Sequence, residues 1–103
     1  MSNISFTGNA TTKMQKLVEK AIKKGDLNGQ QVQKFYKHIL NNSTDTFSYS
    51  LKKVDFLPDH MMVDVFKKSA DGICEYGVKS GAVPTKDIPK ALTNCLKQFL
   101  NDV

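Results

Sequence analysis

The side chains best suited to chemistry are two histidines and two cysteines: His38, His60, Cys74 and Cys95. His60 is close in sequence to Asp59 and Asp64, so a Cys–His–Asp nucleophilic site is the first chemistry to consider. If residues 60–74 form one helix, Cys74 lies about 21 Å from His60, because a helix rises 1.5 Å per residue. The pattern therefore argues against such a site.

Other catalytic and ligand-binding patterns are missing from the sequence. It contains no HExxH, Walker, GxGxxG or GxSxG motif. The cysteines form no CxxC pair and have no histidine at metal-ligand spacing. The sequence therefore predicts a non-enzymatic protein with no catalytic residue, no cofactor and no metal.

Both cysteines fall within or beside predicted apolar faces, which indicates small buried hydrophobic side chains. We therefore predict that both thiols are slow to react in the folded protein. A disulfide between Cys74 and Cys95 is the alternative if the protein is exported, and the sequence leaves open whether they are free or bonded.

The charge is unevenly distributed. All fifteen basic residues are lysines, and the formal net charge is +5. Residues 1–42 hold seven lysines against Glu19 and Asp26, whereas residues 43–103 hold eight lysines against eight acids. This asymmetry favours an acidic partner.

The first predicted helix, residues 10–24, concentrates this charge on one face. Like charges at i,i+4, such as Lys16 and Lys20, repel each other by a few tenths of a kcal/mol, on the order of 0.2–0.5 per pair. Only Glu19 offsets them locally. Two lysines of the second helix are expected to extend the face. The predicted partner-binding residues are Lys13, Lys16, Lys20, Lys23, Lys24, Lys34 and Lys37.

These features predict a protein-interaction module, such as a small adaptor, regulator or inhibitor, that binds an acidic protein surface. The alternative is a nucleic-acid-binding protein that uses the same lysines. The absence of arginine disfavours sequence-specific reading of bases, because arginine is the usual bidentate contact to guanine. Homo-oligomerisation and an ordinary solvated lysine face both remain open.

No apolar run reaches the ~18 residues of a membrane span, and no basic-then-apolar signal peptide is present. The sequence thus predicts a cytoplasmic protein, with export by a specialised route as an alternative. Residues 1–9 are polar and predicted to form a flexible arm before a single domain at residues 10–103.

Three helices have clear end signals. Asn9 or Thr11 can cap the helix at residues 10–24, and Gly25 ends it. Asn28 and Gln31 form a capping box for a second helix, and a short connection places the two helices antiparallel. The last helix is predicted to start near Asp87, with Pro89 in its first turn.

The segment at residues 46–56 fits two patterns. Phe47, Tyr49 and Leu51 alternate as in a strand, whereas Phe47, Leu51 and Val54 fit a helix. A short helix is favoured, because the sequence offers no second convincing strand to pair with it.

Residues 58–81 are predicted to form the central helix, with a wide apolar face that includes Phe66. Gly72 and Gly77 inside it are interpreted as points of close helix packing, although each disfavours a helix by about 1 kcal/mol. The predicted fold is therefore all-α: a small four-helix bundle with a short extra helix or extended segment at residues 46–56. The weaker alternative is a helix-turn-helix formed by the last two helices.

Overall fold

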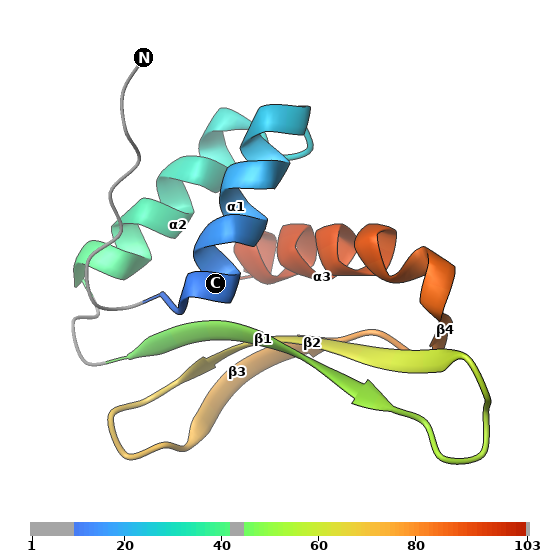
Figure 1. Cartoon of the computed structure of the whole chain (residues 1–103). Coiled ribbons are helices and arrows are strands. Elements are labelled where there is room, and N and C mark those ends of the chain that lie inside the picture. Colours follow the sequence, from blue (N-terminus) through green and yellow to red (C-terminus); the bar gives the residue numbers. More distant parts are fainter. Residues whose placement is uncertain (1–9, 42–44, 103) are drawn as a thin grey trace.

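The computed structural model describes residues 10–41 and 45–102, in which three α-helices lie on one face of a four-stranded antiparallel sheet (Figure 1). The helices are α1 (Thr12–Lys24), α2 (Gly29–Asn41) and α3 (Ile88–Asp102), the last preceded by the 3₁₀ turn η1 (Thr85–Asp87). The strands are β1 (Thr46–Lys53), β2 (His60–Lys68), β3 (Cys74–Lys79) and β4 (Val83–Pro84). The predicted all-α four-helix bundle is therefore wrong, and the fold is α+β. The predicted arm at residues 1–9 lies outside the described residues.

Helix α1 begins and ends as its sequence predicts. The Thr11 hydroxyl accepts a hydrogen bond from the Met14 amide at 3.3 Å, which caps the N-terminus. Gly25 adopts φ 75° at the C-terminus, a left-handed conformation that glycine enters without steric cost. Met14 and Val18 are fully buried on the inner side of the helix.

Helix α2 starts with the predicted capping box. The Gln31 amide donates to Asn28 Oδ1 at 2.8 Å, and the Asn28 amide donates to Gln31 Oε1 at 3.1 Å. Gln31 is itself buried, and its Nε2 donates to Asn101 Oδ1 at 2.9 Å. The cap therefore also fastens the start of α2 to the last turn of α3.

The predicted central helix at residues 58–81 does not exist, and the same residues form β2, β3 and the connection between them. Val63, Val65 and Phe66 are β-branched or aromatic, residue types that favour strands. Gly72 lies in the turn at φ 82°, where its amide donates to the Ser69 carbonyl at 2.9 Å. Because this turn folds β3 back on β2, the segment satisfies its backbone groups across strands rather than within a helix.

Residues 46–53 form strand β1, so the extended alternative is confirmed and the favoured short helix is wrong. β2 is the second strand that the sequence analysis did not identify. Tyr49 pairs with Val65, and Leu51 pairs with Val63. The predicted helix-turn-helix is also wrong, because strands precede α3.

The core lies between the helices and the sheet. Phe47 of β1 is fully buried, and its ring packs edge-on against Phe35 of α2 at 6.3 Å and Phe99 of α3 at 6.2 Å between centroids. Val63 and Val65 lie on the same covered face, and both are also fully buried. Large aromatic side chains from β1, α2 and α3 therefore meet at one point.

Phe66, predicted to belong to the central core, lies on the other face of the sheet. Successive strand residues alternate between faces, so Phe66 points away from the face that carries Val65. Its cross-strand neighbours are Ser48 and Gly77, and the residue is only partly buried. Figure 1 shows no described helix on this side of the sheet.

Candidate functional site

The structure gathers three of the seven predicted partner-binding lysines around one hollow. Lys16, Lys20 and Lys24 follow one another at four-residue steps on α1, and all three are exposed. At 1.5 Å per residue, this row is about 12 Å long. The lysine row lines a hollow of about 200 Å³ between α1, β1 and the start of α3.

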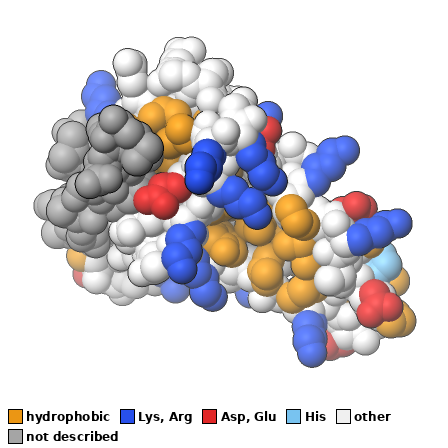
Figure 2. Space-filling view, turned by 45° about the horizontal axis from the view of Figure 1, so that its top comes forward, with side chains coloured by type: hydrophobic (Ala, Val, Ile, Leu, Met, Phe, Trp, Pro, Cys, Tyr) orange, Lys and Arg blue, Asp and Glu red, His pale blue; other side chains and the backbone are white. Residues whose placement is uncertain are grey.

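The floor of this hollow is mainly apolar. Leu17 of α1, Tyr49 of β1 and Leu92 of α3 contribute to it, with Pro89 at one end. We call this site the basic groove: the three lysines and this floor, together with Ala21, Asp26 and Thr93. Figure 2 shows lysine side chains beside hydrophobic side chains on the helical side of the molecule.

The sequence analysis missed the groove residues from β1 and α3. Tyr49 entered the sequence analysis only as part of an alternating pattern, and no residue of the last helix was predicted to bind a partner. Tyr49 and Leu92 are both partly buried in the structure, so they also pack against the core. The alternation of Phe47, Tyr49 and Leu51 was the available signal, because it placed Tyr49 on the same face as the buried Phe47.

The remaining predicted lysines do not line the groove. Lys13, Lys23 and Lys37 are exposed elsewhere on α1 and α2. Lys34 is partly buried, and its Nζ donates to the Asn101 carbonyl at 3.4 Å. The predicted surface therefore divides into a row at the groove and four lysines outside it.

The charge of the lysine row is weakly compensated. In the described part of the chain, the ion pairs within 4.0 Å involve Lys52 and Lys67 and none of the three groove lysines. Asp26 is the one carboxylate among the groove-lining residues. Glu19 is absent from the groove lining and acts on Tyr36 of α2, whose pKa is raised first by burial and then by this carboxylate. An apolar floor beside three unpaired ammonium groups can accept a ligand that is both apolar and anionic.

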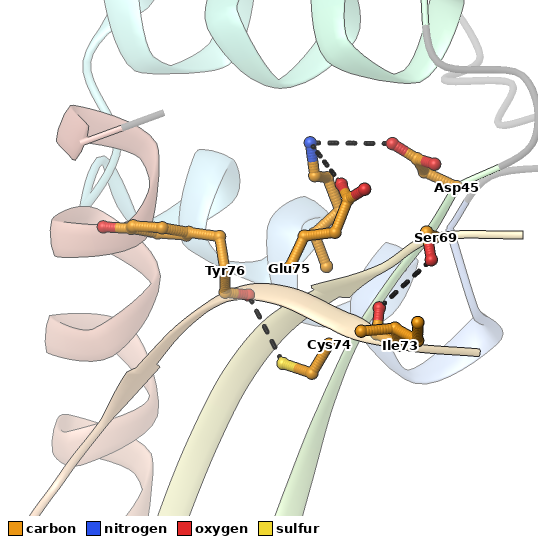
Figure 3. A network of polar contacts seen from close by, with 7 residues as sticks. Asp45, Ser69, Ile73, Cys74, Glu75 and Tyr76 are labelled. Carbon is orange, nitrogen blue, oxygen red and sulfur yellow. Dashed lines mark hydrogen bonds and ion pairs between the residues drawn. The ribbon is translucent and has the colours of Figure 1, made fainter. Parts of the chain in front are cut away.

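Lys67 shows the contrasting case of a lysine that is already engaged. Its Nζ lies 3.5 Å from Asp45 Oδ2 and 3.4 Å from Glu75 Oε2, and the side chain is largely buried (Figure 3). Its positive charge is therefore neutralised within the protein and is not available to a partner.

The histidine and cysteines that suggested chemistry remain separated. Cys74 pairs with Lys68 at one end of β2, whereas His60 begins the strand eight residues away, about 27 Å at the rise of a strand. His60 Nδ1 lies 2.8 Å from the Pro58 carbonyl oxygen. No group of three or more metal-ligating side chains occurs among the residues that the structure describes.

The two thiols are free but differ in environment. Cys95 is buried, as predicted, and burial first, then the Asp64 carboxylate, raise the pKa of its thiol. Cys74 is exposed on β3, so its predicted burial is wrong. Figure 3 shows why: Cys74 and Tyr76 leave β3 on opposite sides, and only Tyr76 points toward α3.

Within the described ranges, no helix combines the length and the apolar character needed to cross a membrane. Comparisons of the chain with protein families, with curated proteins and with solved structures find no match.

Proposed function

We propose that this protein is a non-enzymatic interaction module whose basic groove binds an acidic segment of another protein. The observation that carries the proposal is the row of Lys16, Lys20 and Lys24 beside a partly apolar hollow of about 200 Å³. A hollow of this size accepts one or two side chains rather than a whole cofactor, since pockets for drug-sized ligands hold roughly 300–1,000 Å³. The proposed partner segment therefore carries acidic residues around an apolar anchor.

The spacing of the lysines suits such a segment. Residues four apart on a helix face lie about 6 Å apart, close to the distance between alternate side chains of an extended peptide. Carboxylates at that spacing would face successive lysines while an apolar side chain enters the floor. The ion pairs would mainly speed association, and the buried apolar contact would slow dissociation.

Two free thiols, one of them exposed, are typical of proteins kept in a reducing environment. We therefore propose that the module acts in the cytoplasm, as an adaptor, regulator or inhibitor that occludes its partner.

The test uses two synthetic peptides of equal negative charge, one with a leucine and a phenylalanine among its glutamates and one without apolar residues. Fluorescence anisotropy should show binding of the first peptide and weaker binding of the second. The double variant K16E/K20E should weaken binding at least about tenfold, because it reverses two of the three groove charges.

The matched control is K13E/K23E, which makes the same charge change on the same helix outside the groove. It should weaken binding by less than about threefold. Equal losses in the two double variants, or equal binding of the two peptides, would reduce the site to diffuse charge attraction.

The same assay tests the nucleic-acid alternative with a generic DNA duplex across a salt series. Phosphate binding would give a steep decline in log affinity with log salt, and each contacting lysine removed would lower the slope by nearly one unit. Tight duplex binding with that signature, in the absence of peptide binding, would replace our proposal.

A further inference from the structure

The second hollow of the molecule lies on the face of the sheet that no described helix covers (Figure 1). It has a volume of about 330 Å³ and lies over β1, β2 and β3. We call this surface the open sheet face. The residues that matter here are Lys52, Asp64, Phe66, Lys68, Gly77 and Lys79.

Phe66 provides an aromatic surface in the middle of this face. Its direct neighbour on β3 is Gly77, where a Cβ would lie 3.4 Å from the Phe66 Cβ. Gly77 therefore places no side chain opposite Phe66, and the nearest β3 side chain at that position is Cys74, whose Sγ would lie 3.7 Å from such a Cβ. The Lys68 ammonium lies over the ring, 5.4 Å from its centroid, so a flat ligand that stacks there must displace this exposed side chain.

Asp64, two residues before Phe66 on the same strand, supplies an incompletely used acceptor. Only 7% of the residue is exposed, and its Oδ1 accepts no hydrogen bond from any described residue. Its Oδ2 lies 3.9 Å from Lys52 Nζ, which is beyond hydrogen-bond distance. Buried carboxylate oxygens normally have partners, so this one has unused capacity for N–H donors.

The overall charge of the open sheet face is positive. Lys52, Lys68 and Lys79 line the hollow together with a single carboxylate, that of Asp64, and all three lysines are exposed. The face therefore offers an aromatic ring, a buried acceptor and an excess of cations within one hollow.

We propose that the open sheet face binds single-stranded nucleic acid, with one base stacked on Phe66, its N–H edge at Asp64, and the phosphates on either side of it held by Lys68 and Lys79. Antiparallel sheets that bind single strands use this combination, because unpaired bases stack on aromatic side chains while cations hold the backbone.

A ligand reaches Asp64 by displacing the ends of lysine side chains, and the Lys52 side chain is 66% exposed and free to move. Guanine is the expected base, since its Watson–Crick edge offers two adjacent N–H donors to a carboxylate. The carboxylates of an acidic peptide offer no N–H donor to Asp64.

The test measures binding of fluorescein-labelled eight-nucleotide single strands of G-rich, A-rich and U-rich sequence at low salt. The G-rich strand should bind best. F66L keeps the apolar volume but removes the ring, and it should weaken binding at least about tenfold, as expected for a lost stacking contact. D64N should remove the preference for guanine.

K79Q and K90Q form a matched pair, because both remove one exposed lysine and only Lys79 lines this hollow. K79Q should weaken binding and lower the salt slope, whereas K90Q should change neither by more than about twofold. Far-ultraviolet circular dichroism establishes that each variant is folded, and K79Q decides the matter if F66L is not.

Competition with guanosine monophosphate separates single-stranded nucleic acid, the occupant that we propose, from a free nucleotide. Displacement of the labelled strand by unlabelled strands but not by similar concentrations of the mononucleotide supports the proposal. The proposal is overturned if the mononucleotide displaces the strand equally well, if no single strand binds, if F66L and K79Q bind like the parent, or if an acidic peptide occupies the face instead.

Discussion

The two faces of the sheet are built from the same strands but differ in whether helices cover them, and the difference is clearest along β2. Val63 and Val65 are fully buried under the helices, whereas Asp64 and Phe66 alternate with them toward the helix-free side. The covered face holds the fold together through apolar contacts. The open sheet face carries a ring, a carboxylate and lysines that contribute less to folding. We infer that the covered face mainly stabilises the fold, with the basic groove at the edge of the helical layer, and that the open sheet face is available for recognition.

The thiols give the largest expected contrast between the faces. Cys74 lies exposed on β3, and Cys95 is a buried residue of α3, where its raised pKa further lowers the thiolate fraction. A polar alkylating reagent should label Cys74 at least about a thousandfold faster, because Cys95 reacts only through unfolding. Mass spectrometry of peptides after timed labelling measures both rates. Similar rates at the two cysteines would mean that the core opens readily.

Phe47→Ala should have the largest effect on stability. The ring is fully buried and contacts aromatic side chains of both α2 and α3. Its removal should lower the free energy of unfolding by about 3–5 kcal/mol, as for other buried phenylalanines. Urea denaturation followed by circular dichroism gives the value. A loss below about 1 kcal/mol would show that the core is not centred on Phe47.

Phe66→Ala should destabilise much less, by about 1 kcal/mol, because the ring is partly exposed and none of the described helices packs on it. Its neighbour Val65 is the control, since it is fully buried on the same strand. Val65→Ala should therefore cost more stability than Phe66→Ala, although it removes fewer atoms. The reverse order in urea denaturation would contradict the assignment of the two faces.

Asp64→Asn should have the smallest effect and the opposite sign. The carboxylate is buried with one oxygen unpartnered, and its lysine neighbour is mostly exposed. Replacing the charge by a neutral side chain of similar shape should leave stability unchanged or raise it by up to about 1 kcal/mol. Thermal unfolding at neutral pH checks this. A clear loss would mean that the Lys52–Asp64 pair stabilises the sheet.

The three helices could be predicted because their signals are local. Thr11, Gly25, Asn28 and Gln31 act within a few residues of the helix ends that they determine, and each makes the capping contact that its position predicts. The error at residues 58–81 has the opposite origin. The apolar residues of this segment also fit a helical period. Residues 60–68 form a strand only because they pair with residues 46–53 on one side and with residues 74–79 on the other. Gly72 and Gly77 were the sequence signal against a helix, since two glycines in one predicted helix are unfavourable.

The candidate site divides in the same way. The row of Lys16, Lys20 and Lys24 follows from four-residue spacing on a helix that the sequence predicts well. The floor of the groove depended on tertiary structure, because Tyr49 and Leu92 come from a strand and a helix far apart in the chain. The open sheet face likewise required the register of β2 and β3, which sets Phe66 opposite Gly77. Helical spacing is a property of neighbours in sequence, whereas strand pairing and helix docking are decided by contacts between distant segments as the chain buries its apolar surface.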